Sequence, residues 1–382
     1  MIGNLRLRWI ARMDGAGHYT KMNVRAIFFL AMMATVSFRA AGQGTPSPKK
    51  PFEPPVRFWS GSVTNPVPVR RPGADAPAVL REAPAKVSTQ PALSRRSFDQ
   101  TLRLQVELDR LGFSPGCIDG RWGLQTVEAL RAWERQQGLP DRGVWDEAVS
   151  NRFAGVTNHL TKYVVTTNDL QDLAPVPEGW PERAAMKTMG FANVRERLAE
   201  KFHAKESLLE QLNPSLPRPD LSAGTEVVVP NADTSRDRMP KASRLEVNLD
   251  RKFIEAFNGD GKLIAHCPCS IAHHVEKRPR GETTVASAAL NPNYTFDPAL
   301  FAEDPVAAAL PSKLIIPPGP NNPVGVAWIG LSLPGYGMHG TPRPEDIGRT
   351  ESHGCFRLHN WNAARLVKMV LVGMPVTMVR SD

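Results

Sequence analysis

The sequence predicts a multidomain protein with a small α-helical domain, an α+β segment and a mainly β C-terminal domain. Three observations predict this fold class. A helix–loop–helix pattern occupies Ser97 to about Ser150, and Gly and Pro residues separate helices from a β-branched strand between Tyr163 and Asn231. From about Leu245 onward short strands dominate. A chain of 382 residues is long enough for two or three domains.

The first 42 residues resemble an export signal. Ala26 to Phe38 is an uncharged apolar run, too short to span a bilayer but suited to the apolar region of a signal peptide. Lys21 and Arg25 give it a basic flank. A buried core helix is the alternative. We expect export to the periplasm or cell envelope, with Met22 as the true start.

Residues 43–95 are rich in Pro, Ala, Ser, Lys and Arg and contain few large apolar side chains. Such a composition cannot bury enough surface to fold, so it predicts a disordered linker. The net charge of +9 suits nucleic acid, an anionic membrane surface or an acidic polymer such as cell wall. Because no nucleic-acid-binding module is present, we expect no nucleic-acid partner.

Residues 96–152 predict a compact helical domain. Apolar residues follow helical spacing up to Leu111, a turn with Asp119 and Gly120 follows, and a second helix is expected from Thr126 to Gln137. The segment from Leu111 to Leu139 resembles the peptidoglycan-binding family 1 domain, which implies peptidoglycan binding. Trp122 and Trp133 can pack in the core or stack on sugar, and core packing is the expectation.

Residues 160–232 combine a helix from Val194 to Phe202, a second helix ended by Asn213-Pro214, and a strand from Glu226 to Val229 closed by Pro230. The second half of this segment resembles a LysM-type glycan-binding module. A structural linker domain without a ligand is the alternative reading of the same Gly and Pro pattern.

Residues 243–382 predict the β domain. Strands are expected at 245–249, 253–257 and 263–271, with a turn at Asn258–Gly261 between the last two. Near the end, Asn360 is predicted to cap a helix over 361–372 that stops at Gly373, and a last strand is expected at 376–379.

Three reactive side chains lie just before that helix: His339, His353 and Cys355. A cysteine is a strong nucleophile only as a thiolate, so it needs a lowered pKa or a neighbouring base. Gly354 lacks a Cβ, so backbone N–H groups can approach a substrate oxygen there. A zinc site is the alternative, but it lacks a fourth ligand and a C-x-x-C pair. We therefore expect no metal and no cofactor, and Cys355 in its reduced form.

The surrounding residues resemble the L,D-transpeptidase catalytic domain of the YkuD type. The H-G-T sequence at His339 and the S-H-G-C-F-R-L sequence around Cys355 match that family, as do segments near Pro279, Asn291, Pro317 and Leu358. The resemblance covers roughly 244–380 and implies a mainly β, β-sandwich-like catalytic domain.

The resemblance also implies the chemistry. Cys355 would attack the carbonyl after the L-centre of diaminopimelate in a tetrapeptide stem, release D-Ala and form a thioester. His339 would act as general base and acid, and the Gly340 carbonyl would orient its imidazole. Gly354 would supply an oxyanion-hole N–H, and His353 would have a supporting role.

Four further residues are candidate substrate contacts. Arg357 lies two positions past the nucleophile, so on a strand it shares the face of Cys355 and can hold a carboxylate. A loop-fixing arginine is the alternative. Ser352 can bond substrate or stabilise a turn, while Tyr336 and Trp328 can wall the cleft or belong to its core.

The predicted function is therefore an L,D-transpeptidase that forms 3-3 links between diaminopimelate residues of peptidoglycan. Water as acceptor would instead give an L,D-carboxypeptidase, and a protein lysine would anchor an outer-membrane protein to the wall. A non-catalytic peptidoglycan-binding protein is the alternative from another class. Expected partners are stem peptides, glycan and, as inactivators, carbapenem-type β-lactams.

Overall fold

The computed structural model describes residues 97–216, 221–232, 239–272, 274–301, 305–349 and 354–380. The predicted export signal, the predicted linker, Ser352 and His353 lie outside these ranges. The chain divides into two compact units, Met1–Pro51 and Phe52–Asp382, and every described residue lies in the second. None of the described helices is long and apolar enough to cross a membrane.

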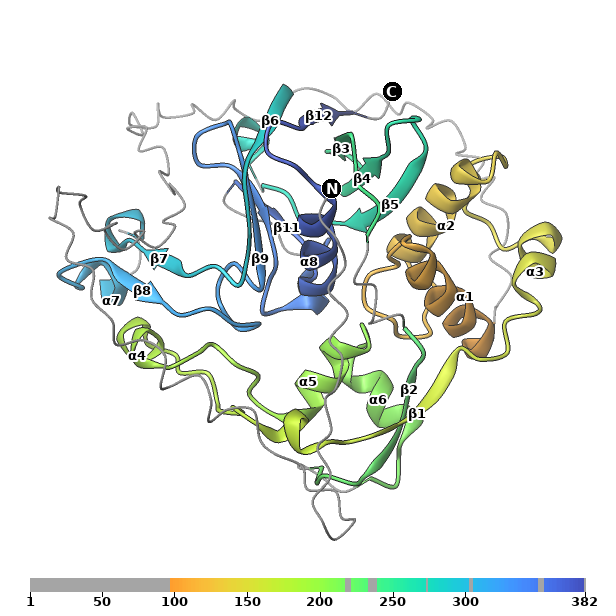
Figure 1. Cartoon of the computed structure of the whole chain (residues 1–382), viewed down its shortest axis with the longest axis horizontal. Helices are drawn as coiled ribbons and strands as arrows, with labels where there is room; N and C mark the ends of the chain where they lie inside the picture. The colour runs from red at the N-terminus through yellow and green to blue at the C-terminus, as the bar shows by residue number, and fades with distance from the viewer. Residues whose placement is uncertain are drawn as a thin grey trace, which may run out of the picture. The chain divides into compact units, whose positions relative to one another are not determined.

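Three helices form the N-terminal described domain: α1 (Phe98–Leu111), α2 (Leu124–Gln136) and α3 (Glu147–Phe153) (Figure 1). Ser97 and Gln100 cap α1 through a reciprocal capping box, and Gly112 ends it with a left-handed φ of 94°. Trp133 is buried and packs on Phe153 with ring centroids 4.9 Å apart. The expected core packing of Trp133 is confirmed.

The next segment is α+β. Strands β1 (Leu160–Val164) and β2 (Glu226–Pro230) pair antiparallel, and the chain between them forms η2 (Thr167–Leu170), α4 (Trp180–Ala185), α5 (Val194–Lys201) and α6 (Glu206–Leu212). Apolar side chains from α5, α6 and both strands share one core with α1. The LysM-like character of this segment stays a prediction.

The C-terminal domain is mainly β, as predicted. Eight strands form one sheet in the order β11-β10-β9-β6-β12-β3-β4-β5. Their bounds are β3 (Arg244–Asn248), β4 (Phe253–Phe257), β5 (Leu263–Pro268), β6 (Gly281–Leu290), β9 (Ala327–Leu331), β10 (Gly337–His339), β11 (Phe356–Arg357) and β12 (Pro375–Val379). A separate hairpin pairs β7 (Tyr294–Phe296) with β8 (Leu314–Ile316). Short helical turns lie at η3 (Val275–Lys277), η4 (Pro298–Leu300), α7 (Pro305–Ala308) and η5 (Pro344–Asp346).

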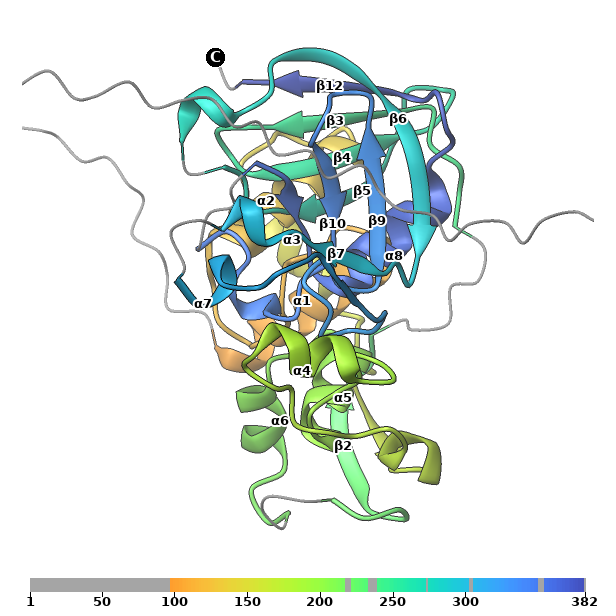
Figure 2. The same ribbon diagram turned by 90° about the vertical axis from the view of Figure 1, so that its left-hand side faces the viewer.

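The long strand β6 curls the sheet. Its first residues pair with β12 and its later residues pair with β9, with a register shift between Val285 and Ser287. Figure 2 shows β6 bending from the side of β12 to the side of β9. The catalytic domain therefore contains one continuous curled sheet of eight strands and not two separate packed sheets.

Helix α8 (Asn360–Met369) packs on one face of this sheet. Residue 360 was expected to be its N-cap, and this is wrong. His359 is the N-cap residue and makes no side-chain capping bond, while Asn360 is the first helical residue. The Asn360 side chain instead bonds two loops that lie beside His339.

The three segments are tied together within their unit. Phe113 forms a parallel bridge with His266 of β5, and Ile118 forms one with Ala204 after α5. The backbone of Met189 donates to the Pro318 carbonyl at 2.9 Å. The helical domain is therefore bonded to the catalytic domain and to the α+β segment. The α+β segment is in turn bonded to the catalytic domain.

Candidate active site

The candidate nucleophile and base lie on neighbouring strands. β10 and β11 run parallel, with His339 opposite Arg357 and Met338 opposite Phe356. Cys355 directly precedes β11. Because side chains alternate between the faces of a strand, Cys355, Arg357 and His339 share one face, and Met338 and Phe356 share the other.

The two faces differ in what covers them. Met338 and Phe356 belong to the core that α8 covers. Cys355 belongs to a different cluster, which contains Trp328, Tyr294 and Phe296. The reactive face therefore lies opposite α8, beneath aromatic side chains from β7 and β9.

His339 is held in one tautomer. Its Nδ1 lies 2.6 Å from the carbonyl oxygen of Gly340, and a carbonyl only accepts, so Nδ1 carries the proton and donates. The imidazole also stacks on Trp328, with ring centroids 5.7 Å apart and an angle of 18°. Nε2 is thereby left as the acceptor, which is the state that a general base requires.

Burial keeps both groups neutral at rest. Cys355 is 8% exposed and His339 is 7% exposed. Burial raises the pKa of the Cys355 thiol to about 11, although a backbone hydrogen bond with Gly337 opposes the rise. Burial lowers the pKa of His339 to about 4; the bond to Gly340 opposes this and the charge of Arg357 adds to it. Burial therefore favours a thiol and a neutral imidazole before substrate binds.

The surroundings of the thiol combine backbone and aromatic groups. The Cys355 thiol donates to the Gly335 carbonyl at a distance of 3.6 Å. Among the described residues, the nearest atom to a Cβ added to Gly354 would be a carbon of the Tyr336 ring at 3.8 Å. The oxyanion-hole role expected of Gly354 stays a prediction.

Arg357 is half-buried on the reactive face, and burial lowers the pKa of its guanidinium. Its main chain exchanges two hydrogen bonds with Ser270, of 2.9 and 3.0 Å. Tyr336 donates its hydroxyl to the Lys277 carbonyl at 2.7 Å. Trp328 is buried against His339. The structure thus brings these three candidates to the site, while Ser352 and His353 are not described.

Two site residues were not singled out from the sequence. Tyr294 packs in the cluster of Cys355, and burial and then the nearby thiol raise its pKa to about 12. Gly337 must be glycine, because an added Cβ would lie 2.6 Å from the Trp328 ring. The Asn-Pro-Asn-Tyr segment was a sequence signal for Tyr294, whereas no sequence signal marked Gly337.

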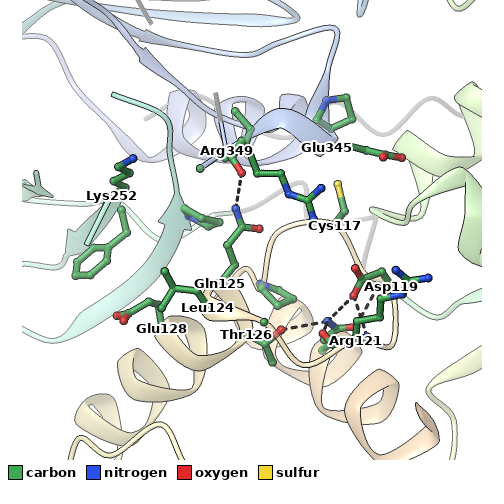
Figure 3. Close-up of a pocket in the computed structure, with 18 of the residues that line it drawn as sticks. Cys117, Asp119, Arg121, Leu124, Gln125, Thr126, Glu128, Lys252, Glu345 and Arg349 are labelled. Atoms are coloured by element: carbon green, nitrogen blue, oxygen red, sulfur yellow. Dashed lines mark hydrogen bonds between the residues drawn. The ribbon is translucent and has the colours of Figure 1, made fainter. Parts of the chain in front are cut away.

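A cavity of about 310 Å³ lies between the helical domain and the catalytic domain, and neither Cys355 nor His339 lines it. In Figure 3 the Gln125 side chain points toward the segment that carries Arg349, and its amide donates to the Ile347 carbonyl at 2.7 Å. Arg349 lies six residues before Cys355 in the sequence. The helical domain is therefore hydrogen-bonded to the segment of the catalytic domain that carries Ile347 and Arg349.

All four cysteines lie in the described part of the chain, and all four are thiols. Within that part, no group of three or more His, Cys, Asp or Glu side chains is placed to hold a metal ion.

Comparison with known proteins assigns the two domains. Residues 242–378 match the family model of the L,D-transpeptidase catalytic domain, and residues 99–152 match a model described as "Putative peptidoglycan binding domain". A protein named "Putative L,D-transpeptidase YkuD" from Bacillus licheniformis is 27% identical over 182 residues, which cover 48% of this chain and 91% of that protein. "Probable L,D-transpeptidase YbiS" from Escherichia coli K12 is 27% identical over 212 residues, covering 53% of this chain and 62% of that protein.

Among solved structures, an L,D-transpeptidase from Xylanimonas cellulosilytica is 16% identical with a TM-score of 0.31, covering 73% of this chain and 93% of that chain. A complex of LdtMt1 with imipenem is 15% identical with a TM-score of 0.27, covering 46% and 86%. The assignment rests on the sequence matches. The chain carries an L,D-transpeptidase catalytic domain at residues 242–378, preceded at residues 99–152 by a domain of the family described as "Putative peptidoglycan binding domain".

Proposed function

We propose that this L,D-transpeptidase is an acyltransferase that uses Cys355 as its nucleophile and His339 as its general base. The observation that carries the proposal is the placement of both side chains on one face of β10 and β11, with the His339 tautomer fixed by Gly340. The substrate is a tetrapeptide stem of peptidoglycan, and the product is a 3-3 link between two diaminopimelate residues.

The proposed proton transfers start from the neutral Cys355 thiol and the neutral His339 imidazole. His339 Nε2 takes the thiol proton while sulfur bonds to the carbonyl carbon after the L-centre of diaminopimelate. The imidazolium then gives this proton to the departing nitrogen of D-Ala as the C–N bond breaks, which leaves a thioester. An acceptor amine attacks the thioester, loses a proton to His339, and the released thiolate takes it back.

Three neighbours support this reaction. The backbone N–H groups of Gly354 and Cys355 stabilise the oxyanion, a role supported by the space that the described residues leave beside Gly354. Arg357 binds a substrate carboxylate from the same face as the thiol. Trp328 and Tyr336 wall the cleft. His353 and Ser352 are proposed to assist, on the strength of their places in the S-H-G-C sequence alone.

The acceptor decides the biological outcome. A diaminopimelate amine gives cross-links, water gives carboxypeptidase products, and a lysine of an outer-membrane protein gives wall anchoring. We favour the first because the domain that matches a peptidoglycan binding model is hydrogen-bonded to Ile347 of the catalytic domain, which would keep wall polymer near the thiol. The site of action is the periplasm or cell envelope, supported by the signal-like run at 26–38.

The test is incubation of the mature protein with defined tetrapeptide muropeptides, followed by mass spectrometry of the products. Cross-linked dimers and released D-Ala are expected from the wild type and none from Cys355→Ala. Cys117→Ala is the matched control, because Cys117 is 7% exposed and lies in the other domain. Products formed by Cys355→Ala would refute the nucleophile, and tripeptides without dimers would make the enzyme a carboxypeptidase.

A further inference from the structure

Asn360 joins two loops beside the base. It is fully buried at the start of α8, and its Oδ1 accepts the backbone N–H of Thr341 at 3.0 Å and of Val326 at 3.2 Å. Thr341 follows Gly340, the residue whose carbonyl holds His339. One amide oxygen therefore anchors the backbone that fixes the tautomer of the base.

The fit around this oxygen is tight. A Cβ added to Gly340 would lie 2.1 Å from Asn360 Oδ1, and one added to Gly325 would lie 2.0 Å from it. Real Cβ atoms do not approach an oxygen so closely, so both positions have to be glycine while Asn360 keeps this orientation. The Asn360 amide therefore packs directly against the Gly340 peptide.

The other half of the amide reaches outside the catalytic domain. Asn360 Nδ2 donates to Glu200 Oε2 at 2.8 Å and to the Pro320 carbonyl at 3.1 Å. Glu200 lies on α5, in the segment between β1 and β2. An ionised carboxylate only accepts hydrogen bonds, so it selects the amide orientation with Nδ2 toward Glu200. The flipped amide would set its NH₂ group against the N–H groups of Thr341 and Val326.

We propose that Asn360 and Glu200 are positioning residues for His339, so that the α+β segment sets the state of the catalytic base. The proposal rests on the role of His339 given above. Neither residue touches the reacting atoms. They act through the Gly340 carbonyl. When the hydrogen bonds that link Glu200, Asn360 and the Gly340 peptide are lost, the imidazole can leave the tautomer that accepts the thiol proton.

We expect the hydrogen bonds that link Glu200, Asn360 and the Gly340–Thr341 peptide to depend on pH near neutrality. Burial raises the pKa of Glu200 to about 7, the hydrogen bond from Asn360 opposes the rise, and the charge of Glu196 adds to it. The groups that line the cavity of about 490 Å³ beside Glu200 include Asp169, Arg197, Lys201, His203, Arg365 and Lys368. Lys201 is paired with Asp169, and Arg365 is paired with Asp109.

Protonation weakens the selection. A neutral carboxyl group can donate as well as accept, so Glu200 then no longer adds to the preference that Thr341, Val326 and Pro320 impose on the Asn360 amide. Activity should therefore fall as the pH drops through the pKa of Glu200, well above the pKa of His339 itself. Glu200→Gln imitates the protonated state at every pH, because its amide can also present either atom.

The experiment measures the rate constant for acylation of the full chain by imipenem, followed by mass spectrometry from pH 5 to pH 9. For the wild type we expect an acid limb near pH 7. In Glu200→Gln the rate at pH 8 should fall about ten-fold, the effect of losing one charge-assisted hydrogen bond, and the limb near 7 should vanish. Glu206→Gln is the control, because burial raises the pKa of Glu206 too but no hydrogen bond among the described residues links it to the site.

A pair of exchanges gives a sharper test. Asn360→Asp keeps an acceptor for Thr341 and Val326 but sets two carboxylates against each other, so acylation should slow. The double variant Glu200→Gln with Asn360→Asp restores a donor–acceptor pair in the reverse sense. It should recover most of the rate, which a merely structural role for either residue does not require.

The outcomes separate this inference from the proposed function. Acylation that persists in Cys355→Ala refutes the nucleophile. Acylation confined to Cys355, with a Glu200→Gln pH profile identical to the wild type, overturns the positioning role alone. Failure of the double variant to exceed Asn360→Asp, with each variant shown to unfold at the wild-type denaturant midpoint, also overturns it.

Discussion

Arg365 holds the carboxylate of Asp109 with two hydrogen bonds, from Nη1 to Oδ1 at 3.0 Å and from Nη2 to Oδ2 at 3.1 Å. Asp109 lies on α1 of the peptidoglycan binding domain and Arg365 lies on α8 of the catalytic domain. His203, two residues after the end of α5, contacts the same carboxylate at 2.8 Å. One buried carboxylate thus joins all three folded segments.

We predict that Asp109→Ala lowers the free energy of unfolding by about 3–5 kcal/mol, because it leaves the Arg365 charge buried without its carboxylate. Asp99→Ala on the same helix should cost less, since Asp99 is 55% exposed in its pairs with Arg103 and His159. Urea unfolding of both variants provides the comparison. Equal losses would contradict the role of the buried cluster.

The same cluster predicts a loss of stability in acid. Burial alone would raise the pKa of Asp109, but Arg365 and His203 more than offset it and hold that pKa well below its usual range. A depressed pKa in the folded state stabilises the protein above the unfolded pKa of about 3.9. That contribution is lost progressively as the pH falls below this value, and Asp109→Asn should lack this part of the acid dependence.

Two glycines of the site should respond differently to alanine. Gly340→Ala forces a Cβ against Asn360 Oδ1, so we expect loss of stability together with loss of Cys355 acylation. Gly354→Ala meets only ordinary contacts among the described residues and should fold as the wild type does, yet acylate slowly, because its methyl group enters the space proposed for the substrate oxygen. Denaturation midpoints and imipenem acylation rates separate the two effects. A fully active Gly354→Ala would argue against an oxyanion hole there.

The sequence pointed to Cys355 and His339, the proposed nucleophile and base, because its signals for them are local. The thiol, the imidazole and the Gly340 carbonyl lie within seventeen residues, and strand alternation is enough to set Cys355 and Arg357 on one face. The strands from 244 to 268 were predicted for the same reason, since each is bounded by turn residues next to it in sequence.

The remaining features depend on contacts between distant residues. An asparagine before a helix usually caps it, so the sequence favoured that role for Asn360, but its actual partners are loops that only the folded sheet brings close. Glu200 lies 160 positions earlier, in a segment whose local pattern indicates an ordinary exposed helix. Periodicity carries no information about such a pairing.

Arg357 offers a test between substrate binding and loop fixation. If it holds a substrate carboxylate, Arg357→Gln should lower kcat/KM for the tetrapeptide donor about ten- to hundred-fold, the worth of a charge-assisted hydrogen bond, mainly through KM. The backbone bonds to Ser270 remain in this variant, so the denaturation midpoint should change little. A large loss of stability with unchanged KM would instead assign Arg357 to the loop.

The neutral thiol and imidazole predict an unusual reactivity profile. With the Cys355 pKa raised to about 11, alkylation by iodoacetamide should be slow at pH 7 and should still be rising at pH 9, because only the thiolate reacts. Acylation by imipenem should nevertheless be efficient at pH 8, since attack on its carbonyl proceeds with proton transfer to His339. His339→Gln should slow acylation about 10²–10⁴-fold while leaving the pH dependence of alkylation nearly unchanged. A wild-type alkylation profile that levels off below pH 8, and is lost in His339→Gln, would show instead that the enzyme rests as a thiolate–imidazolium pair.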